Sequence, residues 1–224
     1  MTFSIVARCN RTGMFGVAIS SSSPAVAARC SYAQAGVGAV ASQNVTDPEL
    51  GPRTLEYLAQ DLPAAEAISK AMSGTPYGEY RQLLAVDKNG TSAIHSGAQA
   101  LGIWASAHAT DVACGGNLLA TDLIPQIMVD SFLASQGHLG DRLITTMRAA
   151  VKAGGEAGPV HSAGLKLVHE VSWPIADLRC DWTEDCPIDE LGQLWDIYKP
   201  QMESYVTRAL NPADAPSFGV LGDQ

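Results

Sequence analysis

The first residues of this chain alternate like a β-strand, in a position where many chains have a frayed terminus. Apolar and polar residues alternate from Thr2 to Arg8, and Val6 is the exception because it is apolar on the polar face. This period of two predicts a strand with one apolar side. Residues 10–13 end in glycine and predict a turn, and Phe15–Ile19 predicts a second apolar strand. We therefore expect a hairpin that begins at residue 2, puts the chain terminus inside a sheet and lies at the edge of a two-sheet core.

The composition is that of a folded chain with a large core. The chain has 224 residues, of which 46% are hydrophobic and 17% are charged. This length suffices for one large domain or two small ones, and we find no linker-like segment or internal repeat that divides it. The net charge of -9 disfavours binding to phosphate backbones and to anionic membranes. We therefore expect neither nucleic acid nor a membrane as a partner.

The sequence shows no signal for export or membrane insertion. Arg8 interrupts any apolar run near the start, and no stretch approaches the roughly 18 apolar residues of a membrane span. These observations predict a cytoplasmic protein. The five cysteines are scattered without a C-x-x-C pair, which argues against a zinc site and against a disulfide framework. A bridge between Cys180 and Cys186 stays open, and we expect no cofactor.

Beyond the hairpin, periodicity and turn residues predict helices in pairs between blocks of strands. Further strands are expected at 36–43, 81–87, 91–95, 101–107, 111–115, 163–168 and 175–180. Helices are expected after Pro52 and after Asp61, and at 123–133, 139–151, 188–198 and 202–210. The Gly-Gly-Asn sequence at 115–117 is expected to break the strand before it.

This order of elements does not fit a βαβ alternation. It predicts an α+β fold, a four-layer αββα sandwich in which two antiparallel sheets stack face to face and helices cover the outsides. We expect a single domain over residues 1–210 and an irregular C-terminal tail over residues 211–224.

Six segments, in consistent order, carry a resemblance to a known family. They are TFSIVAR, TGMFGVAISSSSPAV, GVGAVASQNVTDPELGPR, RQLLAVDKNG, GGN and GGEAGPVHSAGLKLV. Together they resemble the bacterial family catalogued as domain of unknown function 1028, from Thr2 to about Pro200. The resemblance implies the αββα fold of the N-terminal nucleophile (Ntn) hydrolases. The stretch 156–162 departs from the family's pattern, which has an acidic residue, a basic pair and Gln-Ser there.

Thr2 is the candidate catalytic residue. With Met1 removed, Thr2 carries a hydroxyl and a free α-amine, and a small residue after the initiator favours that removal. In an Ntn site the hydroxyl attacks a carbonyl, and the amine, with a pKa of about 8, takes the proton. The resemblance therefore implies an amidohydrolase that cleaves a small-molecule C–N bond without a metal ion.

Other polar residues are candidates for the same site. The Gly-Gly-Asn sequence offers amides to a developing oxyanion, so we expect Gly116 and Asn117 to take part in catalysis. Residues at the ends of apolar strands are expected to bind the small-molecule substrate: Ser20, Ser21, Gln43, Asn44 and His161.

Alternative interpretations stay open. The alternative function is a non-catalytic small-molecule-binding or assembly protein on an Ntn-like fold. A triad of Ser162, His161 and either Asp177 or Asp181 lacks the G-x-S-x-G signature. The histidines lack the spacing of a metal site. The apolar stripe along 188–198 predicts a core or subunit contact, and we expect a homodimer.

Overall fold

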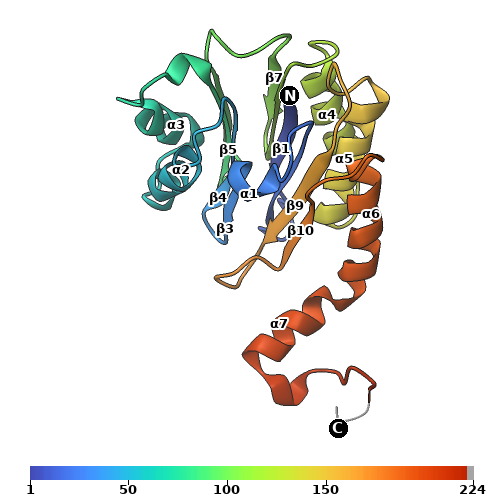
Figure 1. Cartoon of the computed structure of the whole chain (residues 1–224). Helices are drawn as coiled ribbons and strands as arrows, with labels where there is room; N and C mark the ends of the chain where they lie inside the picture. The colour runs from blue at the N-terminus through green and yellow to red at the C-terminus, as the bar shows by residue number, and fades with distance from the viewer. Residues whose placement is uncertain (221–224) are drawn as a thin grey trace.

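Two antiparallel sheets form the centre of the molecule (Figure 1). The computed structural model describes residues 1–220. The six-stranded sheet consists, in spatial order, of β10 (Ala176–Cys180), β9 (Ser162–Val168), β2 (Phe15–Ser21), β1 (Thr2–Arg8), β8 (Val112–Asn117) and β7 (Ala105–Ala109). The four-stranded sheet consists of β3 (Ser31–Gln34), β4 (Gly38–Asn44), β5 (Arg81–Asp87) and β6 (Ser92–Ser96).

Helices cover the outer face of each sheet (Figure 1). The four-stranded sheet packs against α2 (Leu50–Ala59) and α3 (Ala64–Met72), and the six-stranded sheet packs against α4 (Ile124–Ala134), α5 (Leu139–Lys152) and α6 (Pro187–Tyr198). Short helices α1 (Ala27–Cys30), η1 (Gly78–Tyr80), η2 (Lys199–Gln201) and η3 (Pro212–Asp214) lie in connections, and α7 (Met202–Leu210) leads away from the layers. This arrangement confirms the predicted αββα sandwich.

Each central strand contributes to two different cores. In β1, Phe3 and Ile5 pack toward the helices, whereas Val6 packs with Leu84 of β5 between the sheets. Side chains alternate across a strand, so the polar residues of β1 share the inter-sheet face with Val6. Val6 is apolar because it contributes to a second core between the two sheets, on the face of β1 that otherwise carries polar residues.

The N-terminal hairpin lies in the middle of its sheet, so the chain terminus is inside a sheet as expected, and the expected position at the edge of the core is wrong. β1 pairs with β2 on one side and with β8 on the other. The expected break at residues 115–117 is also wrong, because all three residues belong to β8. Space is short at Gly116, where an added Cβ would lie 2.6 Å from Leu119 Cδ2 and the leucine side chain would have to move.

The C-terminal part is only partly attached to the core. Within the described residues, α7 buries Met202 alone. The predicted irregular tail contains one short turn at Pro212–Asp214, and its positions 221–224 lie outside the described residues. No helix between residues 1 and 220 is long and apolar enough to cross a membrane.

Candidate functional site

Thr2 is the first residue of β1 and faces the space between the two sheets. It lies opposite Ser21 of β2 and opposite Asn117 of β8. Residues directly opposite on neighbouring strands point to the same face, so the three side chains lie in one row. All three are buried, and Thr2 is 6% exposed. The fold therefore places a hydroxyl, a second hydroxyl and a carboxamide together at the start of β1.

Two hydroxyl groups converge on the carbonyl oxygen of Met1. Thr2 Oγ1 donates a hydrogen bond to this oxygen at 2.5 Å, and Ser21 Oγ donates to it at 2.5 Å. The two hydroxyl oxygens are 3.3 Å apart. The backbone N–H of Ser23 donates to Ser21 Oγ at 3.1 Å and so fixes that hydroxyl. The site therefore already holds one amide carbonyl, that of the Met1–Thr2 peptide bond.

Beside this hydroxyl pair, a chain of buried amides connects the two sheets. Ser4 Oγ donates to Gln43 Oε1 at 2.6 Å, and Gln43 Nε2 donates to Gln82 Oε1 at 2.7 Å. Asn117 Nδ2 donates to the same Gln82 oxygen at 3.5 Å, while Gln82 Nε2 donates to the carbonyl of Gly116 at 3.2 Å. Gln82 is thus the centre of the network, and it orients Asn117 next to Thr2.

Residues 155–161 follow α5 and pass over the start of β1, from the end of β8 to the end of β2. We call them the cap segment. Glu156 forms a bridge with Leu119, just beyond the end of β8. At the other end of the segment, the backbone N–H of His161 donates to the carbonyl of Ser21 at 2.9 Å. The cap segment therefore joins the two neighbours of β1 at the place where residue 1 enters the sheet.

The carboxyl group of Glu156 is buried in this cap segment. Its Oε2 accepts a hydrogen bond from the backbone N–H of Ser22 at 3.2 Å, and its buried Oε1 has no hydrogen-bond partner. Burial raises the pKa of Glu156 to about 8, and the ammonium group of Met1 acts in the opposite direction. The Met1 side chain lies against Gly158, where an added Cβ would come within 2.9 Å of Met1 Cε.

Four of the residues expected from the sequence lie near Thr2, and three of them direct their side chains to its site. Ser21, Asn117 and Gln43 belong to the row and network around Thr2. Gly116 lies between Phe3 of β1 and Ala105 of β7, so its backbone groups lie in the plane of a paired sheet. It does not present the free amide that a turn at this position would offer.

Ser20 and Asn44 are not brought to the hydroxyl pair. The side chain of Ser20 points to the opposite face of β2 from that of Ser21. Its Oγ donates to the carbonyl of Ser162 at 3.1 Å. The amide of Asn44 connects loops: its Nδ2 donates to the carbonyl of Tyr80, and its Oδ1 accepts from Leu101 at 3.2 Å. Both side chains therefore have structural partners away from Thr2.

His161 reaches the site through its backbone, whereas its ring has other partners. Nδ1 donates to the carbonyl of Thr183 at 2.8 Å, and the ring stacks on Trp182 with centroids 4.3 Å apart. Ser162 Oγ donates to the carbonyl of Ser23 at 2.6 Å. Since neither hydroxyl nor ring is directed at the other, the alternative serine triad is not assembled.

Sequence reasoning missed Gln82 and did not assign a role to Glu156. Gln82 is one polar residue in an apolar strand and has no local signature, although an amide buried in such a strand needs partners. For Glu156, the signal was its place in the stretch that departs from the family pattern.

A family model matches residues 2–191, and it describes a family of unknown function (DUF1028). The chain belongs to this family. The crystal structure of a DUF1028 protein from Silicibacter pomeroyi is 28% identical in sequence and has a TM-score of 0.83, covering 91% of this chain and 94% of that chain. The resemblance expected from the six sequence segments is thus confirmed.

Two other solved structures are much less similar to this DUF1028 chain. Anbu from Hyphomicrobium sp. strain MC1 is 11% identical with a TM-score of 0.40, covering 92% of this chain and 98% of that chain. Anbu (ancestral beta-subunit) from Yersinia bercovieri is 11% identical with a TM-score of 0.37, covering 91% and 97%. Among curated proteins, none matches this chain significantly.

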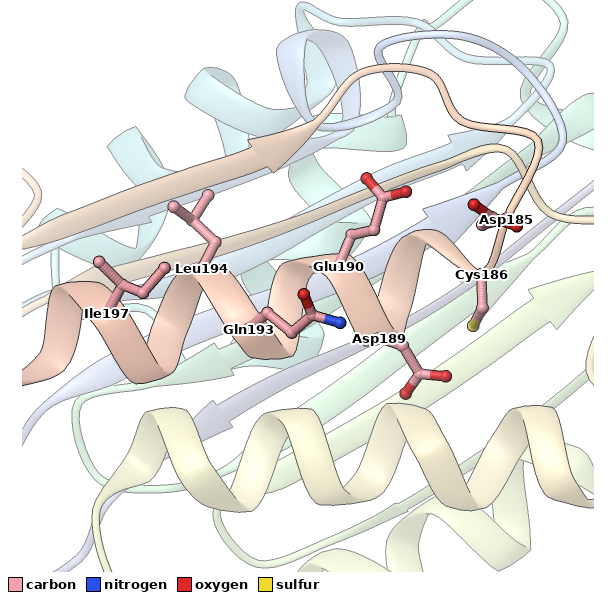
Figure 2. A pocket seen from close by; sticks show the side chains of 7 residues that line it. All are labelled: Asp185, Cys186, Asp189, Glu190, Gln193, Leu194 and Ile197. Carbon is pink, nitrogen blue, oxygen red and sulfur yellow. The ribbon is translucent and has the colours of Figure 1, made fainter.

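The DUF1028 chain also has a hollow of about 630 Å³ on the outer side of α6 (Figure 2). Its lining comes from α6 and the two residues before it: Asp185, Cys186, Asp189, Glu190, Gln193, Leu194 and Ile197. This lining has no hydroxyl beside an amide donor, so we assign the candidate site to Thr2.

Within residues 1–220, no group of three or more His, Cys, Asp and Glu side chains is arranged to hold a metal ion. Cys180 and Cys186 are free thiols.

Proposed function

We propose that this DUF1028 protein is an Ntn-type amidohydrolase that cleaves a small-molecule C–N bond of the amide type. Thr2 is its nucleophile once Met1 is removed. The observation that carries the proposal is the hydrogen bond from Thr2 Oγ1 to the carbonyl oxygen of Met1 at 2.5 Å, shared with Ser21. A site that already binds one amide carbonyl beside a hydroxyl is suited to receive another in its place.

In the proposed reaction, Thr2 Oγ1 attacks the substrate carbonyl carbon and forms an ester with the acyl group. The α-amine of Thr2 takes the hydroxyl proton and passes it to the leaving nitrogen, whose bond to carbon breaks. Water then hydrolyses the ester and restores the hydroxyl. Asn117 Nδ2 is the proposed oxyanion donor, and Ser21 Oγ is the proposed donor to the bound carbonyl.

A second function is favoured by one specific observation. The amides of Gln43, Gln82 and Asn117 are buried and bonded to one another, so they are satisfied without a ligand. A protein that has kept the fold and lost the chemistry would have such an interior. The alternative is therefore a non-catalytic small-molecule-binding or assembly protein.

Location and subunit number are part of the proposal. We expect a cytoplasmic homodimer. Exposed apolar residues on the last helices, Ile197 and Leu210, support a subunit contact because they are 65% and 64% exposed.

The test uses chain that begins at Thr2, released from a cleavable N-terminal fusion. It is incubated with a panel of small primary and secondary amides, and the amine or ammonia released is measured. Thr2→Ala should abolish the release, Thr2→Ser should retain part of it, and Thr145→Ala, an exposed threonine on α5, should match the wild type. Equal rates for Thr2→Ala and the wild type would refute the catalytic assignment.

A further inference from the structure

The start of β1 is enclosed on three sides. β2 and β8 flank Thr2, and the cap segment connects these strands beyond it through Leu119 and Ser21. An amine carried by Thr2 therefore lies on the side of β1 that the cap segment covers. The group that the cap segment presents on this side is the carboxyl of Glu156, through its hydrogen bond with the N–H of Ser22.

One oxygen of this carboxyl lacks a partner. Glu156 is 5% exposed, and its Oε1 is buried without a hydrogen bond. Buried polar atoms are nearly always paired, and a buried carboxyl without a donor is costly. A cationic or neutral amine would supply the missing donor. The ammonium group of Met1 already acts on this carboxyl, so a terminal amine is within electrostatic reach.

We propose that Glu156 is a positioning residue that binds and orients the α-amine of Thr2 after Met1 is removed. The inference rests on the proposed function, because it assigns the group that holds the base of that same site. Glu156 does not touch the substrate. Its role is to fix the amine so that the nitrogen lone pair is directed at the hydroxyl of Thr2.

The charge of Glu156 bears on the protonation state of the amine that it holds. The amine is the base only when it is unprotonated, and a carboxylate beside it favours the ammonium form. The charged group that acts on the carboxyl of Glu156 is the ammonium at the chain terminus, and its hydrogen-bond partner is Ser22. The carboxyl of Glu156 thus sets the pH at which the amine becomes a base.

The experiment measures the α-amine directly. Chain beginning at Thr2 is prepared with 15N-labelled threonine, and the pKa of the amine is read from an NMR titration. Glu156→Gln should lower this pKa by about 1 unit or more, because the negative partner is lost. Glu156→Asp should lower it less, and Glu66→Gln, an exposed acid on α3, should leave it unchanged. An unchanged amine pKa in folded Glu156→Gln would overturn the inference.

A second measurement needs no variant. The 13C titration of the Glu156 carboxyl is compared in chain that keeps Met1 and in chain that begins at Thr2. The inference expects the pKa of Glu156 to differ between the two, and identical titration curves would contradict it. Neither measurement depends on turnover. If the amine pKa shifts as expected but the Thr2→Ala variant hydrolyses amides at the wild-type rate, Glu156 still holds the amine and Thr2 is not the nucleophile.

Discussion

Thr2 of β1 and Asn117 of β8 lie directly opposite each other, and both side chains face the space between the sheets. Asn117 is held there by Gln82, which reaches across from the other sheet. Because β1 is a central strand, Thr2 also has Ser21 of β2 opposite it on the other side. The pairing with Asn117 places a carboxamide donor next to the proposed nucleophile.

Replacement of Asn117 tests this donor. Asn117→Ala should lower kcat on the best amide of the panel by about 100- to 1,000-fold, because one oxyanion donor is removed, and should change KM little. The exposed Asn89→Ala is the matched control. A kcat for Asn117→Ala close to that of the control would remove Asn117 from the catalytic machinery.

Replacement of Gln82 tests the buried amide network. Gln82→Ala leaves the amide donors of Gln43 and Asn117 without their acceptor, and each unsatisfied buried group costs about 1–3 kcal/mol. The free energy of unfolding, measured with urea, should fall accordingly. Gln126→Ala, on the exposed face of α4, should change it by less than about 0.5 kcal/mol. Similar losses for both variants would show that the network does not stabilise the fold.

The stability of chain that keeps Met1 should depend on Glu156 between about pH 4.5 and 8. The pKa of this carboxyl is raised by burial to about 8 in the folded protein, while an unfolded glutamate has a pKa of about 4.3. The folded state therefore binds more protons in this window, and the free energy of unfolding falls as the pH rises through it. Glu156→Gln should flatten the slope, as measured by urea unfolding at a series of pH values. A slope equal to that of the wild type would contradict the raised pKa.

Two helix glycines lie against side chains of different mobility: Gly140 of α5 faces a buried indole, and Gly192 of α6 faces a guanidinium. A Cβ at Gly140 would lie 2.4 Å from the buried indole of Trp195, whereas a Cβ at Gly192 would meet the end of Arg148 at 2.4 Å. The indole is fixed by the core and the guanidinium can move. Gly140→Ala should cost about 1–3 kcal/mol, and Gly192→Ala should be neutral or stabilising by up to about 1 kcal/mol. Thermal unfolding of both variants checks the order, and the reverse order would contradict it.

The sheets and helices could be predicted from periodicity, since β5 begins and ends where the alternation of residues 81–87 places it. β3 could not, because Ser31–Gln34 is short and mixed, and pairing with β4 decides its conformation. Gly115 and Gly116 have the pattern of a break. They form a strand because β8 is paired with β1 on one side and with β7 on the other.

The candidate site could be predicted only where strand ends carry polar residues, as at Ser21 and Asn117. The sequence predicts Ser20 together with Ser21 because it does not show which face of a strand the site occupies. Gln82 and Glu156 come from distant parts of the chain, and their roles depend on contacts across the sheets and across the cap segment. No local sequence pattern predicts such contacts.

The central claim depends on the Met1–Thr2 peptide bond, and the N-terminal residue of the protein tests it most directly. The protein is purified from cells that express it at its natural level, and its intact mass and N-terminal sequence are determined. The account predicts that Met1 is absent and that threonine is the first residue. Retention of Met1 throughout the population would contradict it, because Thr2 would then have no free amine to act as the base.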